Sequence, residues 1–174
     1  FKNNFGIYFR NRNTVAKNDS VYSSSPQIDG FSILNLESSY PLTKKDLFKN
    51  EFLTPKISFR MNPGNNMKNY RNDNKILDAN NIFDINRLGI TDSYEAGKSL
   101  TLGLDYKYDI IEEKDTKSNK QKDKYLEFKL ATVIRDQEEK KIPISSTIDK
   151  KNSNIFGSIN NNLIDNININ YNFS

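Results

Sequence analysis

The stretch EAGKSLTLGLDYKYDII, residues 95–111, decides the fold class of this chain. One set of alternate positions is apolar except for Lys98, and it comprises Ala96, Leu100, Leu102, Leu104, Tyr106, Tyr108 and Ile110. The set between them is small or polar, and it comprises Glu95, Gly97, Ser99, Thr101, Gly103, Asp105, Lys107 and Asp109. A period of two separates the two faces of a β-strand, whereas a helix needs apolar residues three and four apart. An ordinary soluble strand has about five or six residues, so the stretch predicts an unusually long strand.

The same alternation recurs in residues 1–10, 30–40, 52–61, 125–136, 154–163 and 166–173. No convincing helix separates these segments, and residues 44–50 could form only a helical turn too short to be stable alone. Parallel neighbours would need long crossover connections, which are usually helical. We therefore expect an all-β fold, an antiparallel meander of about seven long strands.

Long and short connections alternate along the chain, and residues 62–94 form the longest. Outer-membrane β-barrels have long extracellular loops and short periplasmic turns. The alternation therefore favours part of a large transmembrane β-barrel, with residues 62–94 outside the cell.

A barrel in a membrane places the two sets of alternating residues in different solvents, because lipid cannot solvate polar side chains and a wet interior can. The residues expected to face lipid are Ile57, Phe59, Leu100, Leu102, Leu104, Tyr106, Leu126, Phe128, Leu130, Ile167 and Ile169. The residues expected to face the lumen are Lys56, Ser58, Arg60, Thr101, Asp105, Glu127, Lys129, Asn168 and Asn170.

The composition limits the chemistry that the chain can perform. It has no Cys and no His, which removes thiolate metal sites and the Ser-His and Cys-His catalytic pairs. The sequence around Gly97-Lys98-Ser99 lacks the earlier glycine of a phosphate-binding loop, because that position is Asp92. The acidic residues of the 112–115 segment lie among lysines and indicate a solvated loop. We expect no enzyme, no catalytic residue, no cofactor and no metal site.

Charge and hydropathy narrow the class further. The formal net charge is +4, but basic and acidic residues are interspersed, so we expect no nucleic-acid partner. Hydrophobic residues make up 35% of the chain, which fits a barrel that buries only alternate residues. The 9 Tyr and 11 Phe argue against a disordered chain.

The long connection divides into two halves. Pro63-Gly64 predicts a type II turn at its start. Residues 81–94 mix apolar residues with Asn, Arg and Asp, and we expect them to fold back onto the barrel mouth, because their apolar side chains would otherwise lie in water. Arg87 and Asp92 are the expected polar clasp of this half.

Several short motifs occur in the order typical of one family. Ser38-Ser39-Tyr40-Pro41-Leu42 precedes a strand that starts with Leu53-Thr54-Pro55-Lys56, and the turn Asn62-Pro63-Gly64 follows it. The loop residues that match are Phe83, Asn86, Arg87, Gly89 and Asp92. Ile142-Pro143, the 153–157 segment and Asp165-Asn166-Ile167 come later in the same order. From about Gly30 onward the chain resembles the barrel domain of the LptD family, although Leu88 and Ser93 depart from the usual loop pattern.

The resemblance implies a barrel of the bacterial outer membrane that assembles lipopolysaccharide into the outer leaflet. It implies lipopolysaccharide and outer-membrane lipids as partners, together with a lumenal plug lipoprotein and periplasmic bridge proteins. Residues 1–174 would then be one part of a larger barrel domain, with flanking strands and a periplasmic domain elsewhere. The alternatives from the residues alone are another outer-membrane barrel, such as a porin or nutrient receptor, and a soluble secreted β-rich binding module.

Overall fold

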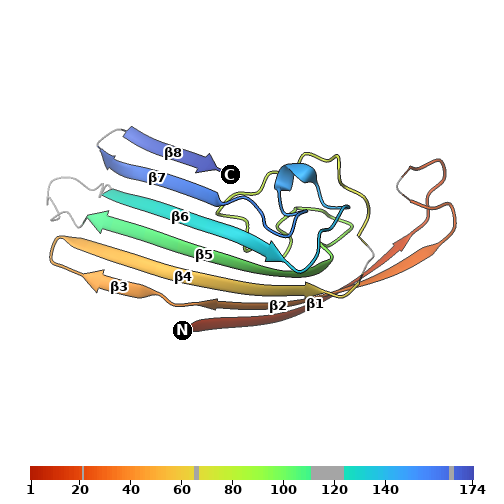
Figure 1. Ribbon diagram of the computed structural model, residues 1–174, viewed down its shortest axis with the longest axis horizontal. Helices are drawn as coiled ribbons and strands as arrows, with labels where there is room; N and C mark the ends of the chain where they lie inside the picture. Colours follow the sequence, from red (N-terminus) through yellow and green to blue (C-terminus); the bar gives the residue numbers. More distant parts are fainter. Residues whose placement is uncertain (21, 65–66, 111–123, 165–166) are drawn as a thin grey trace, which may run out of the picture.

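Eight strands form one antiparallel sheet in the computed structural model, which describes residues 1–20, 22–64, 67–110, 124–164 and 167–174. The strands are β1 (Lys2–Thr14), β2 (Gln27–Ser39), β3 (Leu42–Lys45), β4 (Lys49–Asn62), β5 (Gly97–Ile110), β6 (Lys124–Arg135), β7 (Phe156–Ile164) and β8 (Ile167–Phe173). Their order in the sheet is β1-β2-β4-β5-β6-β7-β8, and β3 pairs with the N-terminal half of β4 (Figure 1). The sheet is open, and β1 and β8 are its edges. The predicted all-β antiparallel meander is confirmed.

The predicted strands match seven of these eight closely. Residues 95–111 become β5, while Ile111, the 112–115 acidic segment and Asn166 lie outside the described residues. Among the described residues, helical structure is limited to the short 3₁₀ turn η1 (Ile144–Ser146). No helix in this part of the chain is long and apolar enough to cross a membrane.

The strand that the sequence did not predict is β3. It is in effect a continuation of β2, because both pair with β4, and the break between them falls at Tyr40-Pro41. Proline has no N–H to donate to a ladder, and the Tyr40 N–H instead donates to the Pro55 carbonyl at 3.0 Å. A tight turn then closes the β3–β4 hairpin, with the Asp46 N–H donating to the Lys49 carbonyl at 2.8 Å.

The turn prediction at Pro63-Gly64 is wrong. A type II turn needs a positive φ at Gly64, whereas the glycines with positive φ are Gly89 and Gly97. Instead the Asn62 side chain accepts a hydrogen bond from the Gly64 N–H at 3.1 Å and shapes the start of the connection.

The pairing register separates the two sets of alternating residues. Ile57 lies opposite Leu102, and Phe59 lies opposite Leu100. Ser58 lies opposite Thr101, and Asp105 lies opposite Lys129 on the next strand. Because successive side chains point to opposite faces, the sheet has one mainly apolar face and one mainly polar face.

The buried core lies on the polar face, at the end of the sheet where β4 and β6 end (Figure 1). Residues 67–96 and 136–155 of the connections fold over this end, and we call them the loop cluster. Its buried apolar side chains pack with those of the sheet, and together they are Met67, Leu77, Ala79, Ile82, Leu88, Ile90, Ala96, Ala131, Val133, Ile142, Ile148 and Phe156. Burying a side chain as large as Ile82 or Leu88 contributes about 1.5–3 kcal/mol to stability. These apolar contacts therefore stabilise the packing of the loop cluster on the sheet.

A two-stranded ribbon extends beyond this end of the sheet. β1 pairs with β2 along its whole length, but β2 pairs with β4 only from Leu34 to Ser39. The remaining half of the hairpin projects past the end of β4 (Figure 1). The loop cluster packs on the sheet and also contacts this ribbon, where Arg12 donates to the Asp92 carbonyl.

Candidate functional site

Phe83 anchors the loop cluster to the middle of the sheet. Its ring occupies the space above Gly103 in β5, where an added Cβ would lie 2.6 Å from the ring. The Lys56 ammonium group lies 5.5 Å from the centroid of the same ring, in a cation–π arrangement. A glycine in mid-strand is unfavourable by itself and often marks a close approach, and here the approaching group is the Phe83 ring.

Arg87 links the loop cluster to β5, and it also binds Glu95 near the C-terminal end of segment 67–96. Its Nε donates to Glu95 Oε2 at 2.7 Å, and its NH2 group donates to Glu95 Oε1 at 2.5 Å. It also donates to the hydroxyls of Thr101 and Ser99, both at 3.0 Å. A bidentate guanidinium–carboxylate pair of this kind fixes orientation as well as charge.

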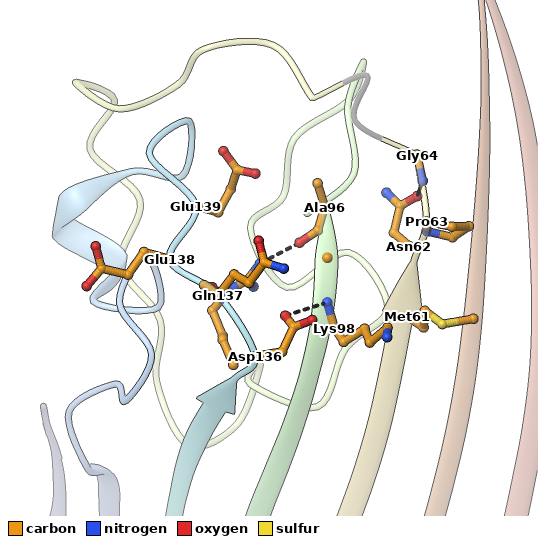
Figure 2. A pocket seen from close by; sticks show the side chains of 12 residues that line it. Met61, Asn62, Pro63, Gly64, Ala96, Lys98, Asp136, Gln137, Glu138 and Glu139 are labelled. Carbon is orange, nitrogen blue, oxygen red and sulfur yellow. Dashed lines mark hydrogen bonds between the residues drawn. The ribbon is translucent and has the colours of Figure 1, made fainter.

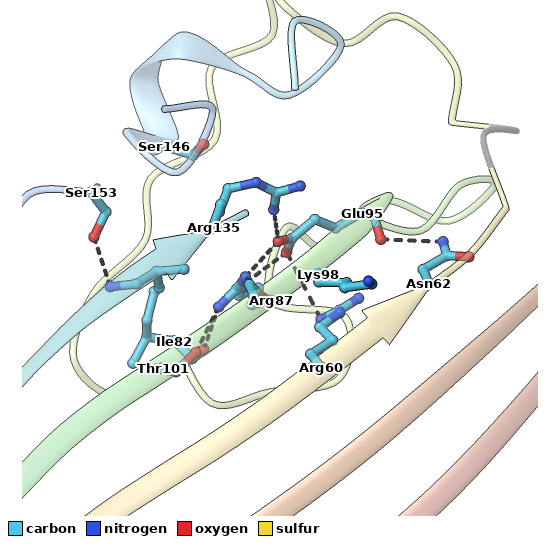
Figure 3. A network of polar contacts seen from close by, with 12 residues as sticks. Arg60, Asn62, Ile82, Arg87, Glu95, Lys98, Thr101, Arg135, Ser146 and Ser153 are labelled. Atoms are coloured by element: carbon cyan, nitrogen blue, oxygen red, sulfur yellow. Dashed lines mark hydrogen bonds and ion pairs between the residues drawn. The ribbon is translucent and has the colours of Figure 1, made fainter. Parts of the chain in front are cut away.

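Glu95 receives two further arginines. Arg135, at the end of β6, donates to Glu95 Oε1, and Arg60, near the end of β4, places NH1 at 3.9 Å from Oε2. Figure 3 shows these side chains converging from the loop cluster, β4 and β6. We call Arg60, Arg87, Glu95 and Arg135 the arginine cluster, and all of its members are buried.

The electrostatics of the arginine cluster are dominated by its burial. Burial alone would raise the pKa of the Glu95 carboxyl, but the positive charges of Arg87, Arg60 and Arg135 outweigh that effect and lower its pKa to about 2. Glu95 is therefore ionised at any physiological pH. Because an uncompensated buried charge is costly, the three guanidinium groups depend on this one carboxylate.

Asp92 holds the loop cluster to the β1–β2 ribbon. Its carboxylate accepts hydrogen bonds from the hydroxyls of Tyr22 and Tyr70, and its carbonyl accepts one from Arg12. Arg12 also pairs with Asp29 on β2. Burial would raise the pKa of Asp92, but the two tyrosine hydrogen bonds and the Arg12 charge lower it overall. The pKa of Tyr70 is raised, first by burial and then by its hydrogen bond to Asp92.

The expected clasp between Arg87 and Asp92 is therefore wrong. Arg87 binds Glu95, and Asp92 belongs to the separate contact with the ribbon. The sequence singled out both residues but could not assign their partners, because the partners depend on how the connections fold over the sheet: Glu95, Tyr22 and Tyr70 all lie in connections.

Asn86 and Gly89 shape the turn between these two contacts. Gly89 has a φ of 61°, and its N–H donates to the Asn86 carbonyl at 2.8 Å. The Asn86 side chain donates to the Ile90 carbonyl at 2.9 Å. The five loop residues singled out in the sequence thus all lie in the loop cluster, in three structural roles: ring anchor, turn and charged contact.

Beyond the arginine cluster, the polar face carries a ladder of ion pairs and hydrogen bonds. Lys56 pairs with Asp105 at 2.5 Å, and Lys129 pairs with Glu127 at 3.4 Å. Asn160 donates to Glu127 at 2.9 Å, and Asn168 and Asn170 lie exposed on β8. By contrast Ser58, Arg60 and Thr101 are buried, because the loop cluster covers their end of the sheet.

The opposite face is apolar and uncovered by other parts of the described chain. Its exposed large side chains include Phe5, Ile7, Phe9, Leu36, Ile57, Leu102, Ile134, Ile167, Ile169 and Tyr171. A row of apolar residues runs across four strands of this face through Phe5, Leu36, Phe59 and Leu100, which are opposite one another in the register. A patch this extensive is typical of a surface that contacts lipid or another protein.

The sequence did not single out Glu95 and Arg135, and it placed Arg60 only as a lumen-facing side chain. The available signal was a set of charged residues on polar positions at the ends of three predicted strands. Their convergence depends on pairing over long sequence separations: Arg60 lies opposite Ser99, and Ser99 lies opposite Arg135.

A pocket of about 310 Å³ opens beside the arginine cluster, at the ends of β4, β5 and β6 (Figure 2). Its lining includes Asn62, Lys98, Arg135 and Asp136, and the Lys98 N–H donates to Asp136 Oδ1 at 3.4 Å. Among the described residues, no group of acidic side chains is arranged to hold a metal ion. The polar face offers hydrogen-bonding and charged groups to a polar ligand, while the other face offers mainly apolar contact.

Comparison with known families matches nearly the whole chain. Residues 4–174 match the sequence profile of the family described as LptD, LPS transport system D. Comparison with curated proteins and with solved structures gave no match. The match agrees with the meander of long strands and spans the loop motif and both sheet faces described above. The chain belongs to the LptD family of the lipopolysaccharide transport system.

Proposed function

We propose that this chain forms a sector of the wall of an outer-membrane barrel that assembles lipopolysaccharide into the outer leaflet. The family is a transport and assembly family rather than a family of enzymes, which supports this role. The observation that carries the proposal is the register of β4, β5 and β6, which gives long strands with one apolar and one polar face. Further strands would complete the barrel from the two open edges, β1 and β8.

In this proposal the apolar face contacts the lipid of the outer membrane, and the polar face lines the lumen. Lipid can accept Leu102 and Ile57 but offers no partner to Lys56 or Asp105, which already pair with each other. The ladder of charged and amide side chains gives the lumen a polar wall along which a sugar-bearing molecule could move.

The loop cluster then narrows the lumen at one end, which we place on the outer side of the membrane. Its support is the position of the two longest connections: 63–96 and 136–155 share one end of the sheet, and the three-residue 46–48 turn lies at the other. Lipopolysaccharide is the proposed substrate. Periplasmic bridge proteins and a plug lipoprotein in the lumen are the proposed partners; the family match supports the bridge proteins, and the plug lipoprotein is proposed from the motif resemblance.

Depletion of the protein in living cells tests the proposed function. We expect newly made lipopolysaccharide to be lost from the cell surface, as measured by a membrane-impermeant probe of its sugars, and to return on re-expression. Unchanged surface lipopolysaccharide would contradict the proposal.

The same experiment separates this role from that of a porin or nutrient receptor, whose strands would obey the same physics. Depletion of such a barrel would slow the entry of a small solute while leaving lipopolysaccharide on the surface. A soluble binding module would be recovered without detergent, and neither measurement would change.

A further inference from the structure

The arginine cluster has more positive charge than its own residues neutralise. Three guanidinium groups face one carboxylate, and two of them already occupy its oxygens at hydrogen-bonding distance. Arg60 has only the longer contact of 3.9 Å to Glu95 Oε2. Buried charges in proteins are normally paired and hydrogen-bonded, so Arg60 is the group with which a further anion would pair.

Arg60 is the open member of the cluster. Its side chain is 6% exposed, and its Nε is buried without a hydrogen-bond partner among the described residues. Its direct register partners, Asn35 on β2 and Ser99 on β5, are uncharged. Ser99 and Asn35 are also engaged already, Ser99 by Arg87 and Asn35 by Ser58.

The chemistry of the Arg60 guanidinium favours an oxyanion as the ligand. A guanidinium presents several N–H donors in a plane, which match the oxygens of a phosphate or carboxylate in pairs. Nearby positive charge from Arg87 and Arg135 favours the more highly charged of these, which is phosphate. Met61 and Asn62, the next two residues of β4, line the open pocket together with Arg135, so a route from solvent reaches this end of the strand.

We propose that Arg60, supported by Arg87 and Arg135, binds a phosphate group at the loop-covered end of the sheet. The phosphate comes either from free ion or from the headgroup of a phosphorylated glycolipid. This inference goes beyond the proposed function, since a barrel could carry out assembly with or without such a site.

Thermal unfolding of the purified protein in detergent tests the site. Sodium phosphate and sodium chloride are titrated at matched ionic strength. Specific binding to the folded state raises Tm and saturates, whereas charge screening affects Tm equally for the two salts. We expect phosphate to raise Tm in the wild type and to have no such effect in Arg60→Gln. Equal responses to phosphate and chloride in the wild type, or an unchanged phosphate response in Arg60→Gln, would overturn the proposal.

Two further variants keep the test decisive. Arg71→Gln is the matched control: Arg71 lies in the same loop cluster, is 41% exposed and pairs with Asp149 at 3.8 Å, so its phosphate response should equal that of the wild type. If Arg60→Gln does not fold, Arg60→Lys keeps the charge but loses the planar fork, and its response should need several-fold more phosphate. A wild-type response from Arg60→Lys, or loss of the response in Arg71→Gln, would count against the site.

The source of the phosphate is identified with detergent-solubilised lipid A, with and without its phosphate groups. A rise in Tm that needs both Arg60 and the lipid phosphates assigns the site to the headgroup. A rise with inorganic phosphate alone assigns it to the free ion. Failure of both ligands refutes the site, while depletion in cells still tests the assembly role separately.

Discussion

At the residue scale, the loop cluster depends on a few side chains whose partners are far away in sequence. Glu95 neutralises arginines from β4, β6 and the loop itself, and Gly103 leaves room for the Phe83 ring. Replacing Glu95 removes the counter-charge of the arginines, and replacing Gly103 removes the space for the Phe83 ring.

Substitution of Glu95 by Gln should be strongly destabilising. It leaves three buried guanidinium groups without a counter-charge, and breaking a buried pair in this way costs about 3–5 kcal/mol. Asp109→Asn is the control, because its pair with Lys107 is partly exposed and should be worth about 0–1 kcal/mol. Urea unfolding of the refolded protein in lipid vesicles measures both, and equal costs would contradict the assigned role of Glu95.

The same residue predicts a pH dependence. The Glu95 pKa is lowered from 4.5 to about 2, so its contribution to stability is fully present above pH 4.5 and is lost as the pH falls toward 2. We expect the free energy of unfolding of the wild type to fall through this range more steeply than that of Glu95→Gln. Parallel curves for the two proteins would show that Glu95 does not titrate as described.

Gly103→Val should weaken the docking of the loop cluster. An added Cβ would meet the Phe83 ring at 2.6 Å, and overpacking of this kind costs about 1–3 kcal/mol. Gly30→Val is the control, since an added Cβ at Gly30 meets no atom within 4 Å. The cost at Gly103 should shrink in a Phe83→Ala background, and a cost that does not depend on residue 83 would contradict the contact.

At the element scale, local periodicity predicted the strands well. It could not predict the contacts and the additional strand that depend on pairing between residues far apart in the sequence. Leu102 and Thr101 reveal their opposite faces by alternation alone. The partners of Arg87 and Asp92 could not be predicted, because they depend on which strand ends come together and on the fold of the loop. The break at Tyr40-Pro41 is visible as a proline in the sequence, but the continuation as β3 depends on pairing with β4.

The polar residues were all expected to face a wet lumen, but they occupy two different environments in the structure. Thr101 and Ser58 are buried and hydrogen-bonded, Thr101 to Arg87 of the loop cluster and Ser58 to Asn35 of β2, whereas Lys56 and Asp105 pair on a more open part of the same face. Polar alternation therefore predicts the face but does not distinguish a solvated side chain from one hydrogen-bonded beneath a loop.

The position of the longest connection gives a prediction for this scale. The chain has no Cys, so single cysteines placed at Asn69 and Phe83 can be labelled without competition from it. In intact cells a membrane-impermeant reagent should label Asn69, which is exposed, far more than Phe83, which packs on Gly103. Labelling of Asn69 only after permeabilisation of the outer membrane would place the loop cluster on the periplasmic side.

At the scale of the whole molecule, the account requires the sheet to separate two solvents. The apolar row through Phe5, Leu36, Phe59 and Leu100 faces away from the loop cluster and from the charged ladder. A soluble protein would cover such a row with a second layer, and the described part of the chain supplies that layer only on the polar face.

Spin labels on cysteines along β5 test this central claim most directly, with the protein reconstituted in lipid vesicles. Labels at Leu102, Leu104 and Tyr106 should be relaxed by oxygen, which concentrates in lipid. Labels at Asp105 and Lys107 should be relaxed by a water-soluble nickel complex, giving a period of two along the strand. Accessibility to the nickel complex at all five positions, or the absence of alternation, would contradict a sheet that forms the wall of a membrane barrel.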